Sequence, residues 1–480
     1  MRVRIQAPGH FKAVADFAAH LQTIDPSWQI DRELGGPDGA LAQPIEVHGR
    51  TLSNRFACHP MEGWDGTVDG RPSELTLRRW TNFGRSGAAL VWGGEAFAVQ
   101  RDGRANPRQL YLDPKVDVLA TLTALLAALR RGAAEAGARP DEPFVGLQLT
   151  HSGRWSRPDG PAAPLLVQHH PQLAAKYPAH AAAHVLTDAE LEALGENYVK
   201  AAKLAQAAGF DFVDVKSCHG YLLHELLGAR HRAGRYGGES LEDRTRLFER
   251  IVAGIRSECP GLHIGVRLSL ADLVPFEKDP ESGLGRPMAC ELPYTHGFGV
   301  DPDDPTNFDW TEPTQLLQRY EELGIELINI TLGSPYYNPH LQRPAAYPPS
   351  DGYRPPVDPL VSVKAHLDAV RAAKSAAPRL KLVGTGYTYL QEWLAHCGQH
   401  EVRTGHVDFV GIGRMLLSYP ELPRDVVAGN ALQKKRICRT FSDCTTGPRN
   451  GMISGCFPLD PFYKAMPEAK RVKALRDGAK

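Results

Sequence analysis

The feature that most constrains this chain is a series of eight short apolar segments, spread over most of its length. Runs this short and apolar are typical of strands buried on both faces, as in parallel sheets. The eight segments are residues 55–59, 89–92, 144–149, 210–215, 263–268, 327–330, 380–383 and 407–411.

The stretches between these segments carry helical signals. Thr187 and Glu190 have the spacing of a capping box, apolar residues follow at helical spacing, and Gly209 stands where a C-terminal glycine belongs. Ser240 to Asp243 opens a second helix in the same way. Eight alternating strand–helix units predict an α/β fold, a TIM (β/α)8 barrel, whose active site lies at the carboxyl ends of the strands.

The length of the chain is compatible with this single barrel. At about 150 residues per domain, 480 residues suggest three domains, but α/β barrels commonly exceed that size. We predict an N-terminal extension at residues 1–40, a barrel at 41–435 and a C-terminal extension at 436–480. Residues 275–312, rich in Pro, Gly and Asp, are expected to form a long loop over the barrel mouth.

The composition restricts the kinds of partner. Lys plus Arg and Asp plus Glu both number 55, so no net positive charge attracts nucleic acid or anionic lipid. No signal peptide is recognisable, no stretch approaches the roughly 20 apolar residues that span a bilayer, and most of the cysteines are scattered. We expect a cytoplasmic location, without a nucleic-acid or membrane partner; the oligomeric state, a homodimer included, stays open.

Glycines follow the last two predicted strands. Gly384 and Gly386 come after the seventh, and Gly413 and Arg414 after the eighth. Glycines let backbone amides approach an anion, and arginine adds a forked charged donor. This is where TIM barrels often hold a phosphate, although these glycines could also merely turn the chain beside an exposed arginine.

Several segments in order along the chain carry a family resemblance. They are Asn54-Arg55, Pro60-Met61, Gly94-Glu95-Ala96, residues 148–154, His219-Gly220-Tyr221-Leu222, Tyr236-Gly237-Gly238, Arg267-Leu268-Ser269 and residues 411–414. Over about residues 41–430 the chain resembles the old yellow enzyme family of FMN-dependent oxidoreductases. It is most similar to the branch of dienoyl-CoA reductase and trimethylamine dehydrogenase.

The resemblance implies noncovalently bound FMN, with NAD(P)H as electron donor. It implies that the phosphate is held by Gly384, Gly386, Gly413 and Arg414, and that the flavin ring lies on Pro60 and Met61. It also implies that Ala96 and Gln148 contact the pyrimidine edge and that Arg267 lies at the N1–O2 side. A fixed cation at Arg267 would stabilise the negative charge of a reduced flavin. An ion pair between Arg267 and a carboxylate is the alternative.

Substrate chemistry is implied at the fourth strand. By the resemblance, Lys216 and His219 hold a substrate carbonyl or anionic oxygen and Tyr221 donates a proton. Lys216 replaces the histidine that is more common in the family, and lysine is a flexible, stronger cation. A structural salt bridge for Lys216 and core packing for Tyr221 are the alternatives.

Two further departures bear on the substrate. Glu62 stands where the family usually has a small hydroxyl or thiol, so it is a candidate base, a group that lowers the flavin potential, or a partner of Lys216. Gly234 and Arg230 replace the family's acidic residue and asparagine before Tyr236. Substrate identity is expected to depend on residues 275–312 and on Trp64, Tyr336 and Tyr337.

The C-terminal cysteines invite an iron–sulfur interpretation. Cys438, Cys444 and Cys456 resemble cluster ligands of the larger relatives, but Phe441 occupies the second ligand position. A 4Fe–4S cluster ordinarily needs four thiolates, so we expect a tail without a cluster; a cluster with Ser442, Asp443 or another substitute ligand, or a zinc site, stays open.

The leading prediction is hydride transfer from NAD(P)H through FMN to an activated alkene, such as an α,β-unsaturated carbonyl compound. Glu62 as a base keeps amine oxidation, demethylation or desaturation open on the same barrel. A third hypothesis is a flavin-free lyase in which Lys216 forms a Schiff base.

Overall fold

A computed structural model describes residues 5–139 and 141–478 of this chain. Eight parallel strands form a closed barrel in chain order, because β4 pairs with both β3 and β6. They are β3 (Phe56–Cys58), β4 (Leu90–Val91), β6 (Phe144–Thr150), β9 (Phe212–Val215), β10 (His263–Ser269), β13 (Leu327–Thr331), β14 (Lys381–Gly384) and β15 (Phe409–Ile412). All eight predicted strands are confirmed, and so is the TIM barrel.

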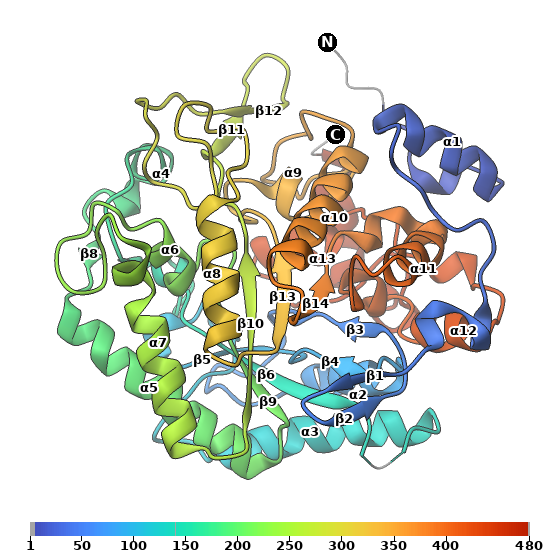
Figure 1. Ribbon diagram of the computed structural model, residues 1–480, viewed down its shortest axis with the longest axis horizontal. Coiled ribbons are helices and arrows are strands. Elements are labelled where there is room, and N and C mark those ends of the chain that lie inside the picture. Colours follow the sequence, from blue (N-terminus) through green and yellow to red (C-terminus); the bar gives the residue numbers. More distant parts are fainter. Residues whose placement is uncertain (1–4, 140, 479–480) are drawn as a thin grey trace.

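Helices surround the strands, as Figure 1 shows. They are α2 (Glu74–Arg85), α3 (Val118–Glu135), α5 (Asp188–Ala208), α7 (Leu241–Glu258), α8 (Thr311–Glu322), α10 (Pro359–Ala376), α11 (Leu394–Arg403) and α12 (Leu422–Val427). Thr187 and Glu190 form the expected capping box before α5, and Gly209 ends that helix at φ 94°. Ser240 caps α7 by accepting a hydrogen bond from the Asp243 N–H. The predicted capping residues of these two helices are therefore confirmed.

The end of the barrel opposite the carboxyl ends of the strands is closed. The antiparallel strands β1 (Ile45–Val47) and β2 (Arg50–Leu52) contribute side chains to an apolar cluster inside the barrel. Trp92, Phe144 and Phe212 belong to the same cluster and are fully buried. The interior is thus packed at this end, and space for a ligand is left only toward the carboxyl ends of the strands.

Smaller elements line that other end. Strand β5 (Ala96–Ala98) adds a ninth strand beside β6, and β7 (Leu165–Leu166) pairs with β8 (His184–Val185). The short helices there are α4 (Pro171–Lys176), α6 (Leu222–Leu227) and α9 (Pro339–Gln342). Residues 275–312, predicted as a long loop, contain short elements: β11 (Phe276–Lys278) and β12 (Gly285–Pro287) pair in an antiparallel hairpin (Figure 1), and α8 begins at Thr311.

Both predicted extensions pack on the barrel. In the N-terminal one, α1 (Val14–Ile24) places Phe17 against Trp393 with ring centroids 5.7 Å apart. In the C-terminal one are α13 (Asp443–Arg449), α14 (Pro461–Lys464) and α15 (Glu468–Gly478). Asp460 in that extension accepts a two-pronged ion pair from Arg78 of α2. Among the described residues, no helix is long and apolar enough to cross a membrane.

Candidate active site

A cavity of about 680 Å³ lies at the carboxyl ends of the barrel strands. That volume is in the range of small-molecule and cofactor sites. The predicted site residues that line it are Pro60, Met61, Glu62, Gln148, Lys216, His219, Tyr221, Arg267, Gly386, Gly413 and Arg414. Ala96 and Gly384 are not in its lining: Ala96 is buried in β5 opposite Gln148, and Gly384 is the last residue of β14.

His59 forms part of the cavity floor and was not among the predicted site residues. Its ring lies 3.1 Å from Asn329 Nδ2 and 3.2 Å from Thr385 Oγ1. A Cβ at Gly411 would stand 2.2 Å from this ring, so only glycine fits there. Burial, followed by the charge of Arg267, lowers the pKa of His59 well below its usual value, so the imidazole is neutral near pH 7.

A buried carboxylate, Asp214, orients two predicted cofactor residues. It accepts hydrogen bonds from Gln148 Nε2 at 2.6 Å, the Arg267 backbone N–H at 2.7 Å and Trp92 Nε1 at 2.8 Å. Three donors satisfy a carboxylate that is fully buried. Asp214 lies in a segment that the sequence analysis treated as an apolar strand. The one sequence signal for its role as a hydrogen-bond acceptor was that it is a charged residue in that segment.

Asp214 should make the stability of the protein depend on pH. Burial raises the pKa of its carboxyl to about 6, whereas an unfolded chain has about 3.9. The native state therefore holds more protons between these values, and the free energy of unfolding falls by about 2 kcal/mol as the pH rises from 4 to 6. We expect Asp214→Asn to flatten this decline, as measured by urea unfolding of the apoprotein at several pH values. Parallel pH profiles for the variant and the parent protein would contradict the assignment.

Arg267 is a buried cation without a carboxylate partner. Its Nη1 reaches the Pro60 carbonyl oxygen at 3.4 Å, and its Nε is buried without a hydrogen-bond partner. Among the described residues, no acidic side chain lies within ion-pair distance of it, so the ion-pair alternative fails there. Burial lowers the pKa of this guanidinium, yet a group that starts at 12.5 stays charged at neutral pH.

Lys216, Tyr221 and Glu62 converge on one wall of the cavity. Lys216 Nζ lies 3.7 Å from the centroid of the Tyr221 ring, and the Tyr221 hydroxyl donates to Glu62 Oε2 at 2.7 Å. Within the described ranges no carboxylate pairs with Lys216, so the salt-bridge alternative also fails there. Burial and the Glu62 charge raise the pKa of Tyr221 well above 10, so the phenol keeps its proton at neutral pH.

Tyr336 extends this wall. Its hydroxyl is 3.0 Å from that of Tyr221, and its ring stacks on Trp155 at 4.1 Å between centroids. Trp64 also lines the cavity, whereas Tyr337 is buried behind it against Gly220. The sequence analysis named Tyr336 as a residue that affects substrate identity but could not say where it lies. It did not name Trp155 as a site residue.

His219 is held in an unusual backbone conformation, with φ 67°. Its N–H donates to Ser269 Oγ at 3.0 Å, and its carbonyl oxygen accepts from Ser334 Oγ at 2.8 Å. Backbone strain of this kind is retained when surrounding contacts determine it, and it clusters at functional sites. Burial, with the charges of Arg267 and Lys216, lowers the pKa of His219 well below its usual range, so the ring is neutral near pH 7.

At the other end of the cavity two arginines lie side by side. Arg414 Nη2 donates to the Pro344 carbonyl oxygen at 3.0 Å, and its Nη1 is buried without a partner. Arg343 donates through Nη1 to Thr445 Oγ1, and its Nη2 is likewise buried without a partner. Burial and the Arg414 charge lower the pKa of Arg343 to about 10. Arg343 stands in a Pro-rich stretch without a motif, so sequence reasoning missed it.

The residues present fit FMN. Two adjacent cations with buried unsatisfied donors suit a phosphate dianion, and Gly386 beside them has φ 99°. A Cβ at Gly413 would make only ordinary van der Waals contact, at 3.7 Å from His59 and 3.8 Å from Met61. Arg267 lines the same cavity and also has an unsatisfied donor, and the resemblance expects the N1–O2 edge at this residue.

The cysteine-rich tail does not fit an iron–sulfur cluster. In the described part of the chain no group of three His, Cys, Asp or Glu side chains is arranged to hold a metal ion. Phe441 packs against Tyr347 and under Arg476, with centroid distances of 5.7 and 5.3 Å. Burial raises the pKa of the Cys438 and Cys456 thiols, and Phe441 leaves the tail without the fourth thiolate that a cluster ordinarily needs.

Comparison with known proteins gives one family and a set of related folds. The NADH:flavin oxidoreductase / NADH oxidase family matches residues 40–281. An NADPH dehydrogenase of Geobacillus sp. (strain WCH70) is 27% identical over 396 residues, 80% of this chain and 92% of that protein. The NADH:flavin oxidoreductase FG08077 of Gibberella zeae is 29% identical over 316 residues, 60% of this chain and 66% of that protein.

Solved structures share the fold at low identity. A 2-naphthoyl-CoA reductase matches with a TM-score of 0.63 and 17% identity, over 91% of this chain. The match spans only 58% of that longer protein. Morphinone reductase matches with a TM-score of 0.55 and 19% identity, over 82% of this chain and 91% of its own.

Proposed function

The chain belongs to the NADH:flavin oxidoreductase / NADH oxidase family of FMN-dependent oxidoreductases, and on that premise we propose that it reduces activated alkenes with electrons from NAD(P)H. The observation that carries this proposal is the single cavity in which Lys216, His219, Tyr221 and Arg267 meet. The name NADPH dehydrogenase, which several of the relatives carry, supports NADPH as the donor.

The cofactor would be held along the length of this cavity. Arg414 and Arg343 would bind its phosphate beside Gly386 and Gly413. Pro60 and Met61 would support the flavin ring, Gln148 would meet its pyrimidine edge, and Arg267 its N1–O2 side. Asp214 would act through Gln148 and Arg267, because it fixes both. The chemistry that FMN supplies when bound is hydride transfer, from a reduced nicotinamide nucleotide to an alkene carbon.

The chain's own residues would prepare the substrate. Lys216 and neutral His219 donate hydrogen bonds to the carbonyl oxygen of an enone, which makes its β-carbon more electrophilic. The Tyr221 phenol supplies the proton that the α-carbon takes up as hydride reaches the β-carbon. Tyr221 keeps that proton at neutral pH, and Tyr336 OH at 3.0 Å provides a second hydroxyl to replenish it.

The test is a turnover assay on purified protein loaded with FMN. We expect NADPH to bleach the flavin absorption anaerobically and 2-cyclohexenone to restore it, with cyclohexanone as product. The proposal fails if the protein does not retain FMN, or if the reduced enzyme is not reoxidised by any α,β-unsaturated ketone, aldehyde or thioester offered.

Amine oxidation is a second candidate that one observation favours. Glu62 places a carboxylate within 2.7 Å of the Tyr221 hydroxyl, close to the stacked rings of Trp155 and Tyr336. Such a wall suits a cationic amine, which aromatic faces and a carboxylate both attract. Anaerobic mixing with amines, without NADPH, would bleach the flavin if this direction applies. Family membership leaves no support for the flavin-free Schiff-base lyase.

A further inference from the structure

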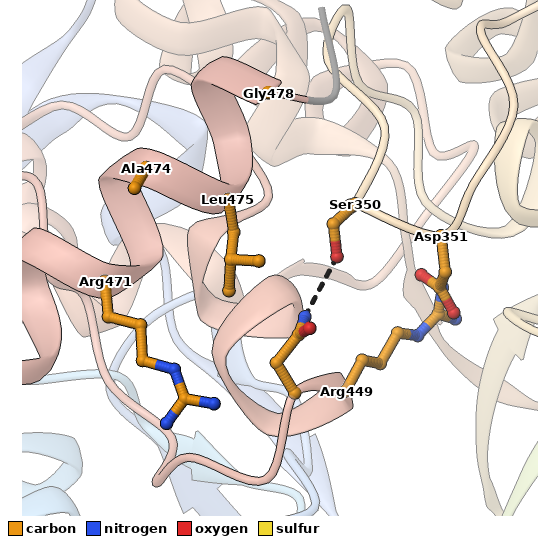
Figure 2. A pocket seen from close by; sticks show the side chains of 8 residues that line it. Ser350, Asp351, Arg449, Arg471, Ala474, Leu475 and Gly478 are labelled. Carbon is orange, nitrogen blue, oxygen red and sulfur yellow. Dashed lines mark hydrogen bonds and ion pairs between the residues drawn. The ribbon is translucent and has the colours of Figure 1, made fainter.

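A second hollow lies beside the active-site cavity, between helix α15 and the segment at residues 350–351. It has a volume of about 620 Å³. Figure 2 shows Arg471, Ala474 and Leu475 on α15 along one side, and Ser350, Asp351 and Arg449 along the other. We call this hollow the α15 groove.

The α15 groove carries one cation that has no partner. Arg471 is exposed, and among the described residues no hydrogen bond or ion pair engages its guanidinium. Across the groove, Arg449 Nη1 pairs with Asp351 Oδ1 at 2.6 Å. Asn450 Nδ2 donates to Ser350 Oγ at 3.0 Å, which fixes the facing wall. Because Asp351 already neutralises Arg449, the excess positive charge of the groove is that of Arg471, and it favours an anion.

The α15 groove and the active-site cavity share residues. Asp351 and Arg449 line both. Arg449 Nη2 also donates to the Pro335 carbonyl oxygen at 3.0 Å, next to Tyr336 of the substrate wall. Asp351 and Arg449 therefore stand at the boundary between the two hollows, and a ligand that extended outward from Tyr336 over Arg449 would reach the groove.

We propose that the α15 groove binds the adenosine phosphate portion of a ligand whose reactive end enters the active-site cavity. Arg471 and Arg449 would contact the phosphates, because arginine forms forked hydrogen bonds with them. Ala474 and Leu475 offer an apolar surface for the adenine ring. Two ligands carry this group, a nicotinamide dinucleotide and a coenzyme A thioester. This proposal rests on the proposed function only in assuming that the reactive end of the ligand enters the active-site cavity.

The test reverses the charge of Arg471. An exposed ion pair contributes up to about fivefold in affinity, and reversal also adds repulsion, so Arg471→Glu should raise the Kd for NADPH about tenfold. The Kd is taken from the concentration dependence of anaerobic flavin reduction. Reduced nicotinamide mononucleotide, which lacks adenosine phosphate, should be unaffected. Lys470→Glu is the matched control, because Lys470 is exposed on the same helix and does not line the groove.

Two further arms separate the possible ligands. Reoxidation of the reduced enzyme is compared for crotonyl-CoA and for 2-cyclohexenone, which has no phosphate. A tenfold rise in the crotonyl-CoA half-saturation concentration alone assigns the groove to a thioester, and a rise in the NADPH Kd alone assigns it to the dinucleotide. Unchanged values for both ligands overturn the proposal.

A turnover-independent measurement keeps the two proposals apart. ADP-ribose carries the adenosine diphosphate without a reactive ring, and its binding is measured by calorimetry. If Arg471→Glu weakens the binding of ADP-ribose and Lys470→Glu does not, the result supports adenosine phosphate binding in the α15 groove, even if the protein reduces no alkene. Equal binding of ADP-ribose to the parent protein and to both variants would overturn the proposed binding in the groove, even if alkene reduction were established.

Discussion

Replacing Arg343 with glutamine should weaken FMN binding by about 10- to 100-fold. A hydrogen bond to a charged group contributes about 1.5–3 kcal/mol, and each 1.4 kcal/mol is a factor of ten. Arg343 Nη2 is buried without a partner beside Arg414, whose Nη1 is in the same state. A phosphate dianion would satisfy both atoms. The Kd is measured by quenching of FMN fluorescence on titration with apoprotein.

Riboflavin provides the internal control for this prediction, because it has the same ring and no phosphate. Arg343→Gln should leave riboflavin affinity unchanged, and Arg286→Gln, on the exposed strand β12, should change neither ligand. A similar loss for FMN and riboflavin would mean that the variant damages the cavity generally. No loss for FMN would remove Arg343 from the phosphate site.

Replacing Tyr221 with phenylalanine should slow alkene reduction by about 10²- to 10⁴-fold, the usual contribution of a positioned general acid. The loss should fall on reoxidation of the reduced enzyme by 2-cyclohexenone. Flavin reduction by NADPH needs no proton donor at this position and should keep its rate within about twofold. Stopped-flow measurement of the two half-reactions separates these effects.

Tyr336→Phe is the matched variant for this prediction. It removes the neighbouring hydroxyl, 3.0 Å away, and leaves the Tyr221 bond to Glu62 in place. We expect it to reduce reoxidation far less than Tyr221→Phe does. Equal effects of the two variants, or a Tyr221→Phe loss confined to flavin reduction, would contradict the assigned proton donor.

The barrel could be predicted because strands buried on both faces leave a simple signal. Segments such as 144–149 and 407–411 are short and almost wholly apolar, and helix caps such as Thr187 separate them. Residues at the strand ends then had to meet, because parallel strands of a closed barrel present their carboxyl ends together. This is why Gln148, Lys216 and Arg267 were expected in one site and line one cavity.

The remaining site residues leave no such signal. Arg343 lies in an irregular connection, and its place depends on a hydrogen bond to Thr445, about one hundred positions later in the chain. Asp214 is one polar residue in an apolar strand, and only the three donors around it reveal its role. The hairpin of β11 and β12 was missed because proline and glycine hid its pairing.

The hydrogen bond that Arg343 donates to Thr445 has a consequence for how the protein is made. Protein synthesis runs from the N-terminus, and Thr445 follows all eight barrel strands in the chain. During translation the barrel can therefore close while its mouth is still incomplete. The hydrogen bond between Arg343 and Thr445 can form only after helix α13, which holds Thr445 and Arg449, has emerged. On the phosphate site proposed for Arg343, tight capture of the cofactor would be a late step of biogenesis, and a ribosome stalled before residue 443 should display a barrel that releases FMN readily.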